Sequence, residues 1–197
     1  MRKKKALLLI DVQNDFCPGG TLAVKQADKI VPILNKYIRY FTEQKLPIFA
    51  SRDWHARNTK HFKQFGGIWP KHCVQRTKGA QFHAKLRLSK QVIIVSKGID
   101  PAKEGYSAFE AIDSNGIVLE KLLNILKVEE LCVGGLATDY CVRSSALDAL
   151  NKGFRVKLLT DAIKGVDLKP GDSDAAIRQM VKTGAKTITF ESLKRIK

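Results

Sequence analysis

The chain has 197 residues, of which 44% are hydrophobic and 8% aromatic, enough to bury the core of one globular domain. No uncharged apolar run approaches the roughly 20 residues needed to cross a bilayer, and the short apolar run after the opening MRKKK is too brief for a secretory signal. The net charge of +16 is spread along the chain without a helix-turn-helix or RNA-binding motif. We therefore expect a cytoplasmic protein with a single domain over residues 1–197, without membrane association or specific nucleic-acid binding.

Apolar runs and helical spacings alternate along the chain, and the four cysteines form no C-x-x-C pair. In chain order we predict a strand at 6–10, a helix at 27–44, strands at 47–50 and 91–96, a helix at 116–126, a strand at 130–133, a helix at 139–151, a strand at 155–160, a helix at 172–183 and a strand at 186–190. This alternation predicts an α/β fold of three layers, α/β/α, with a six-stranded, mostly parallel sheet and helices on both faces. Ligands of such sheets bind outside the carboxyl ends of the strands.

The segment from 56 to 90 has no clear periodicity and is long for a simple connection, so we predict irregular loops of the kind that carry sites. Residues 52–90 contain ten lysines or arginines and a single acid, Asp53. This basic stretch is either a solvated loop or an electropositive rim that steers anionic ligands.

Three apolar runs end with a chemically active residue: Asp11, Lys97 and Cys141. Together a carboxylate, an ammonium and a thiol can produce a thiolate nucleophile at neutral pH. Cys141 also lies two residues after Asp139, a predicted N-cap, so we place it in the first turn of a helix that favours an anion. The alternative is a core cysteine beside a structural ion pair of Asp11 and Lys97, and proximity of Cys141 to that pair distinguishes the two readings.

A second group of residues has the chemistry of a metal site. Asp53 and His55 alternate in the sequence RDWH and so point to the same side of an extended chain. With His72 they offer one oxygen and two nitrogens, as expected of a catalytic zinc or a similar divalent ion. We interpret His61 and His83 as surface residues.

The motifs LLLIDVQNDFCPGG, SRDWH, WPKHCVQ, SKG and GGLATDYCV resemble, in order and spacing, those of the nicotinamidase/pyrazinamidase family within the isochorismatase-like cysteine hydrolases. The resemblance covers nearly the whole chain. It implies the following roles: Asp11 as general base, Lys97 as its charge partner, Cys141 as nucleophile, Asp53, His55 and His72 as metal ligands, the N–H groups of Ala137 and Cys141 as oxyanion hole, and a cis peptide bond between Leu136 and Ala137.

The resemblance further implies a metal-assisted cysteine amidohydrolase that converts nicotinamide to nicotinate and ammonia through a thioester, accepts pyrazinamide and serves NAD salvage. Phe16, Trp69 and Tyr106 are the expected contacts of the substrate ring. The metal is expected to be Zn²⁺, with Fe²⁺ or Mn²⁺ as alternatives, and the protein a homo-oligomer. Because residues 56–71 contain no Asp or Glu, we expect water to complete the metal shell.

Two other functions remain open on the same residues. Another amidohydrolase or isochorismatase of the superfamily would share the Asp, Lys and Cys but usually lacks the metal trio. A non-catalytic binding protein on this fold has no reason to retain all three reactive residues.

Overall fold

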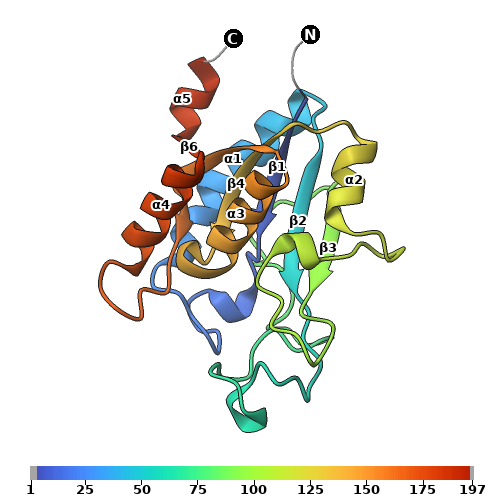
Figure 1. Ribbon diagram of the computed structural model, residues 1–197, viewed down its shortest axis with the longest axis vertical. Coiled ribbons are helices and arrows are strands. Elements are labelled where there is room, and N and C mark those ends of the chain that lie inside the picture. The colour runs from blue at the N-terminus through green and yellow to red at the C-terminus, as the bar shows by residue number, and fades with distance from the viewer. Residues whose placement is uncertain (1–3, 196–197) are drawn as a thin grey trace.

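A six-stranded sheet forms the centre of the structure, a computed structural model in which residues 4–195 are described (Figure 1). Its strands follow the spatial order β3 (Ile93–Lys97), β2 (Ile48–Asp53), β1 (Lys5–Ile10), β4 (Glu130–Leu136), β5 (Arg155–Lys164) and β6 (Lys186–Ile188). Every neighbouring pair is parallel. The predicted six-stranded α/β sheet is therefore confirmed. Residues 6–10 of the central β1 are all buried, as expected of a parallel strand covered on both faces.

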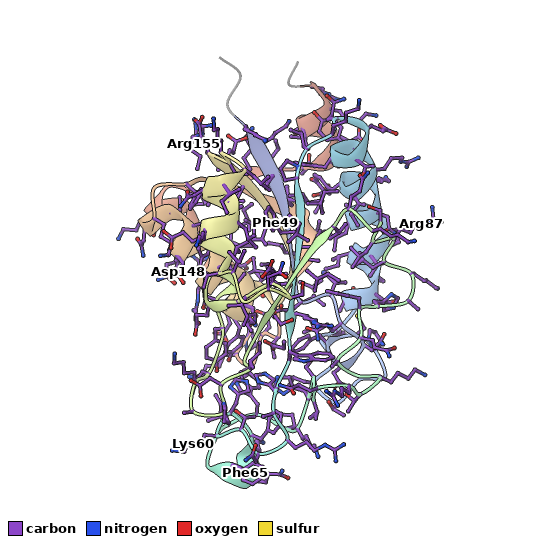
Figure 2. The ribbon with its side chains drawn as sticks, turned by 90° about the vertical axis from the view of Figure 1, so that its right-hand side faces the viewer. Phe49, Lys60, Phe65, Arg87, Asp148 and Arg155 are labelled. Carbon is purple, nitrogen blue, oxygen red and sulfur yellow. The ribbon has the colours of Figure 1, made fainter. Side chains whose placement is uncertain are left out.

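Helices cover both faces of this sheet, which gives the expected three layers. On one face lie α1 (Val31–Glu43) and α5 (Phe190–Arg195), and on the other α2 (Leu119–Ile125), α3 (Arg143–Asn151) and α4 (Asp172–Thr183). Each face has its own hydrophobic core, and alternate residues of β1 contribute to one or the other. The side chain of Phe49 lies at the centre of the molecule (Figure 2).

The burial pattern of α1 shows how the sequence produces this packing. Val31, Leu34, Ile38 and Phe41 are buried at spacings of three and four residues, so they form one apolar stripe against the sheet. Burying each such side chain contributes roughly 1.5–3 kcal/mol. Pro32 lies in the first turn of the helix, where its missing N–H group costs no hydrogen bond.

Several predicted element bounds differ from the structure. Strand β2 continues to Asp53 because residues 51–53, although polar, pair with β3 up to the register Asp53↔Lys97. The segment predicted as a helix over 27–44 is a 3₁₀ turn, Ala27–Ile30, followed by α1, and the predicted last strand ends at Ile188 because Phe190 begins α5. Strands β4 and β5 also run further than their apolar residues indicated.

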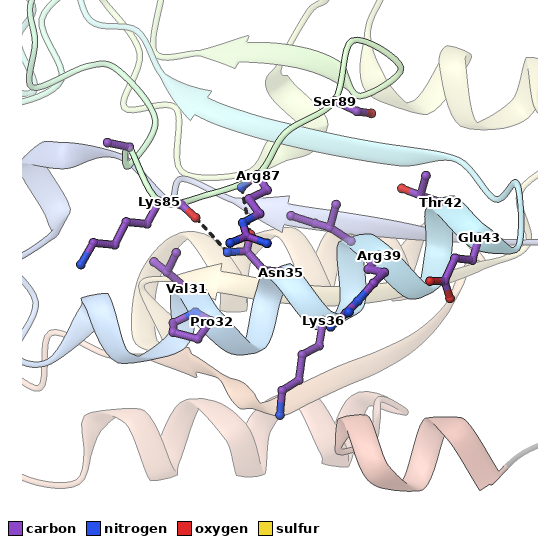
Figure 3. Close-up of a pocket in the computed structure, with 12 residues that line it drawn as sticks. Val31, Pro32, Asn35, Lys36, Arg39, Thr42, Glu43, Lys85, Arg87 and Ser89 are labelled. Carbon is purple, nitrogen blue, oxygen red and sulfur yellow. Dashed lines mark hydrogen bonds between the residues drawn. The ribbon is translucent and has the colours of Figure 1, made fainter.

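The irregular segment between β2 and β3 extends beyond the carboxyl end of the sheet and then returns along α1. It contains only one short helical turn, Lys63–Phe65, and the labelled Lys60 and Phe65 lie at one end of the molecule in Figure 2. Its returning part is held to α1 by Asn35, whose amide donates to the carbonyl of Lys85 (2.8 Å) and accepts from the N–H of Arg87 (2.9 Å) (Figure 3). An open hollow of about 830 Å³ lies between α1 and this part of the segment.

Among residues 4–195, no helix combines the length and the apolar character that a membrane crossing needs.

Candidate active site

The carboxyl ends of β1, β3 and β4 bring three reactive side chains together. Lys97 is the last residue of β3, and its Nζ lies 2.9 Å from Asp11 Oδ2 and 3.4 Å from Cys141 Sγ. Asp11 directly follows β1 and accepts a hydrogen bond from Ser51 Oγ at 2.6 Å. Lys97 also donates to the carbonyl oxygen of Gly105 at 2.9 Å. The ion pair and the thiol therefore form one buried group, in which Asp11 is fully buried and Lys97 is 1% exposed.

Burial determines the protonation of this group. Burial raises the pKa of the Cys141 thiol well above its ordinary value. The nearby Lys97 ammonium lowers this pKa but does not offset the effect of burial. Burial also raises the pKa of Asp11, against the attraction of Lys97. Burial would lower the pKa of Lys97, but Asp11 and Asp53 raise it well above its ordinary value, so the ammonium keeps its charge. Cys141 is thus held as a thiol next to Asp11, the residue predicted to take its proton.

Asp53 lies between this group and a cluster of histidines. Its Oδ1 contacts Lys97 Nζ, while its Oδ2 lies 3.6 Å from His55 Nε2 and 3.9 Å from His72 Nε2. Burial opposes ionisation of Asp53, but Lys97 and the two histidines hold its pKa well below the ordinary range. One carboxylate therefore contacts the ammonium with one oxygen and faces the imidazoles with the other.

The histidine cluster contains three rings, one more than predicted. Nitrogen atoms of His55, His61 and His72 lie within 4.8 Å of one another, and all three residues are buried. The interpretation of His61 as a surface residue is wrong, because residues 56–62 fold back so that its ring stacks on that of His55, with centroids 4.7 Å apart. His83 is half-buried and lies outside this cluster.

The missed residue was signalled weakly by the sequence. The interval 56–71 contains no carboxylate that could complete the metal shell, but it does contain His61. A fourth protein side chain is therefore available where water was expected. Nothing in the local pattern shows that it turns inward, because the turn is set by backbone bonds such as Lys63 N–H to Trp69 C=O (2.8 Å).

The three histidines fit a divalent metal. The Nδ1 of His55 pairs with the carbonyl of Gly98 (3.2 Å) and that of His72 with the carbonyl of Pro70 (2.7 Å), which directs each Nε2 inward, as in metal-bound histidines. His55 Nε2 and His61 Nδ1 are buried without a hydrogen-bond partner among the described residues. Such a buried orphan costs roughly 1–3 kcal/mol, which a metal ion would offset.

The protonation of these histidines suits a metal as well. Burial lowers the pKa of His61 to about 3, and it lowers the pKa of His72 against the attraction of Asp53. The imidazoles of His61 and His72 are therefore held in the neutral form, the form that binds metal.

The segment that carries Cys141 leaves β4 through an unusual turn. The peptide bond between Leu136 and Ala137 is cis, at the position that the family resemblance implied. A π-helical turn, Thr138–Val142, then precedes α3, so Cys141 lies in this turn and not in the first turn of a regular helix. At the end of β4, Gly135 has φ +126°, and a Cβ there would come 2.1 Å from the carbonyl oxygen of Ile10. Glycine thus allows β4 to lie close to β1 directly beside the reactive group.

The predicted helix N-cap, Asp139, has a different role. Its carboxylate accepts hydrogen bonds from the N–H groups of Val166 (2.9 Å) and Asp167 (2.8 Å), in the loop after β5. No side-chain cap bond forms at the start of α3. The prediction is wrong because the chain forms a π-helical turn at this point, and the carboxylate instead fastens one wall of the cavity described next.

A small cavity opens next to the reactive thiol. It is lined by Cys141, Ala137, Asp53, His61, His72, Phe16, Leu22, Trp69, Glu104, Gly105, Tyr106, Tyr140 and Val166, and its volume is about 30 Å³. The three predicted ring contacts, Phe16, Trp69 and Tyr106, are all among its walls. Trp69 Nε1 donates to Tyr106 Oη at 2.8 Å, and the rings of Trp69 and Tyr140 meet edge to face at 4.9 Å.

Comparison with known proteins gives a consistent result. The isochorismatase domain family matches residues 5–192. A nicotinamidase of Escherichia coli K12 is 38% identical, over 94% of this chain and 95% of that protein, and a nicotinamidase/pyrazinamidase of Mycobacterium tuberculosis is 34% identical, over 95% and 100%. The solved structure of the pyrazinamidase of Pyrococcus horikoshii in complex with zinc has 46% identity and a TM-score of 0.88, over 95% of this chain and 99% of that one.

Proposed function

Because this chain belongs to the isochorismatase domain family, we propose that it is a nicotinamidase, a hydrolase that converts nicotinamide to nicotinate and ammonia in the salvage of NAD. It also accepts pyrazinamide, the substrate named for two of its relatives. The observation that carries the proposal is Asp53, which contacts Lys97 of the reactive group and faces the histidine cluster. The nucleophile and the metal site are thereby parts of one pocket, whereas an amidohydrolase without a metal needs only the first.

We assign the metal site to Asp53, His55 and His72, with His61 as a further ligand. The proposed ion is Zn²⁺, since a relative of 46% identity was solved with zinc, and Fe²⁺ or Mn²⁺ would accept the same donors. A divalent ion held there supplies an electrophilic centre that can accept the lone pair of a pyridine nitrogen. That nitrogen is what distinguishes nicotinamide and pyrazinamide from benzamide.

The reacting residues divide the proton transfers among them. Asp11 takes the proton of Cys141, and the Sγ attacks the carboxamide carbon while the nearby Lys97 ammonium stabilises the negative charge. The N–H groups of Ala137 and Cys141 hold the oxyanion. Asp11 then gives its proton to the leaving nitrogen, which departs as ammonia and leaves a thioester on Cys141.

Hydrolysis of the thioester restores the starting state. Asp11, now a carboxylate, accepts a proton from water as that water attacks the thioester carbonyl. The product acid loses its remaining proton to solvent and leaves as nicotinate, and the proton on Asp11 returns to the thiolate of Cys141. Asp11 contacts Lys97 and has a carboxylate oxygen within 4.8 Å of the sulfur, so it can serve both half-reactions without moving.

Substrate orientation is assigned to the aromatic walls of the cavity. Phe16, Trp69 and Tyr106 line the same cavity as Cys141, His61 and His72. A pyridine ring between them would place its carboxamide toward the sulfur and its ring nitrogen toward the histidines. Such positioning of the reacting carbon is a large part of the rate enhancement that enzymes achieve.

Two further features complete the proposal. We place the protein in the cytoplasm, where the four cysteines, all free thiols in the structure, stay reduced. We also propose a homo-oligomer, which sedimentation or light scattering of the purified protein tests.

The test is ammonia release by the purified protein from nicotinamide, with benzamide as a substrate of the same shape that lacks the ring nitrogen. Nicotinamide should be hydrolysed far faster than benzamide, and treatment with a chelator should abolish the release until zinc is added back. No ammonia from nicotinamide by zinc-loaded protein would overturn the assignment.

A further inference from the structure

The segment that follows β1, residues 11–15, contacts both halves of the site. Asp11 belongs to the reactive group, whereas the side chains of Gln13 and Asp15 form their hydrogen bonds with backbone groups. Both are nevertheless buried: Gln13 is fully buried, and Asp15 is 9% exposed. A buried polar side chain costs free energy unless its hydrogen bonds are made, so the partners of these two residues indicate their role.

The side-chain amide of Gln13 pairs with the end of β2 in the way that the backbone of a neighbouring strand would. Strand β1 pairs with β2 only as far as Leu9↔Ala50, with one further bond from Asp11 N–H to the carbonyl of Ser51 (3.2 Å). Beyond that point the peptide groups of Asp53 would lack partners on this side. The Gln13 amide supplies both, because its Oε1 accepts from Asp53 N–H (2.7 Å) and its Nε2 donates to Asp53 C=O (2.8 Å).

Nε2 of Gln13 also donates to the carbonyl of Ala80 (2.9 Å), which ties the returning loop to the same point. A primary amide is the side-chain group that offers a donor and an acceptor in the geometry of a peptide. Glutamate at this position would keep the acceptor for Asp53 N–H but would place an oxygen against two carbonyl oxygens.

Asp15 fixes the backbone between two histidines of the cluster. Its Oδ2 accepts from the N–H of Cys73 at 2.7 Å, the residue directly after His72. Cys73 has φ +44°, a conformation that a non-glycine residue adopts only when its surroundings hold it there. The carbonyl of Cys73 in turn accepts from His55 N–H at 3.0 Å.

The space around Asp15 is shaped for this contact. The Asp15 N–H donates to the carbonyl of Gly79 at 3.0 Å, and a Cβ on Gly79 would come 2.0 Å from the Asp15 carboxylate. The carboxylate therefore lies flat against a glycine, with one oxygen aimed at Cys73 N–H. The backbone directly after His72 is thus attached to the segment after β1 by this bond, and the later part of the same loop is attached through Gly79 and Ala80.

From these contacts we propose that Gln13 and Asp15 are positioning residues for the metal. Gln13 fixes the backbone of Asp53. Asp15 fixes the backbone of Cys73, which follows His72 in the chain and accepts a hydrogen bond from the N–H of His55. Because Asp11 begins the same segment, the proton acceptor and the metal ligands are held to one short piece of chain. The inference rests on the proposed metal site and adds two residues that act on it without contacting the ion.

The deciding experiment measures zinc affinity of the metal-stripped protein by competition with a chromophoric chelator. Asp15→Ala is expected to weaken zinc binding by about 10- to 100-fold, the usual effect of losing a residue that orients metal ligands. Asp15→Asn should stay within about threefold of wild type, because an amide oxygen can still accept from Cys73 N–H. Gln13→Glu should weaken binding at least about tenfold through the loss of its donor to Asp53.

A matched control separates positioning from general stability. Asp161 also accepts a backbone N–H, from Phe190 (2.9 Å), and a side-chain hydroxyl, from Tyr37 (2.8 Å), but it lies at the α1–α5 face. Asp161→Ala should lower the melting temperature of the metal-free protein and leave zinc affinity unchanged.

Two results would overturn the inference while the metal site stands. One is wild-type zinc affinity in Asp15→Ala, and the other is an equal loss of affinity in Asp161→Ala. If the wild-type protein itself fails to bind zinc, the proposed metal site is wrong and the inference is overturned with it. The wild-type titration thus distinguishes failure of the proposed function from failure of the positioning role.

Discussion

Replacement of Lys97 by methionine should destabilise the protein strongly, because the ammonium is the shared counter-charge of two buried carboxylates. Its Nζ lies 2.9 Å from Asp11 Oδ2 and also contacts Asp53. At an effective dielectric constant of about 20, one such pair at this distance is worth roughly 6 kcal/mol. Methionine recovers the several kcal/mol that burying an ammonium costs. The expected net loss in the free energy of unfolding is about 3–5 kcal/mol, the range found when one member of a buried pair is removed.

The assay is urea denaturation at pH 7 in the presence of a chelator, so that bound metal does not replace the missing charge. A double variant provides the sharper reading. Lys97→Met with Asp11→Asn leaves only one buried carboxylate, Asp53, in place of two that repel each other. Its loss in the free energy of unfolding should therefore be smaller than the sum of the losses of the two single variants, by at least about 1 kcal/mol.

Two outcomes would refute this reasoning. A loss below about 1 kcal/mol in Lys97→Met would mean that the ammonium is not needed to compensate the carboxylates. Strict additivity in the double variant would mean that Asp11 and Lys97 do not interact in the folded protein, despite the 2.9 Å between them.

Three other predictions follow from the site. Cys141→Ala should lower ammonia release from nicotinamide at least about 10³-fold while metal analysis finds zinc still bound, and substantial remaining activity would remove the thiol from the mechanism. His61→Ala should weaken zinc binding at least about tenfold in chelator competition, and unchanged affinity would return water to that position. In Gly98→Ala the new Cβ would lie 2.4 Å from His55 Cε1, so zinc affinity should fall, whereas Gly66→Ala, at a similar positive φ with nothing within 4 Å, should change only the melting temperature.

The parts of the site that lie at strand ends could be predicted from the sequence. Asp11 and Lys97 each follow an apolar run, and a parallel sheet brings the carboxyl ends of its strands to one edge. Asp53 lies at this edge as well, three residues past the predicted end of the strand at 47–50. The strand pattern therefore places Asp11 and Lys97 at this edge, whereas the roles of these two residues and of Cys141 rest on the family resemblance.

The parts that failed depend on backbone geometry that leaves no periodic signal. The inward turn of His61 is fixed by bonds within an irregular segment, and the π-helical turn at Cys141 prevents Asp139 from capping α3. The contacts of Gln13 show the same limit, since they depend on where β1 stops pairing with β2. Composition and spacing describe strands and helices, and these residues lie where neither continues.

The cavity beside Cys141 has a kinetic consequence. Its volume of about 30 Å³ is room for one water molecule, whereas pockets for small ligands usually enclose about 300–1,000 Å³. A pyridine ring can enter only if the walls part, and the bond from Trp69 to Tyr106 joins two of those walls. Each catalytic cycle then includes an opening for entry and another for departure of nicotinate. Opening of these walls is therefore a step of every turnover, and turnover cannot be faster than that opening.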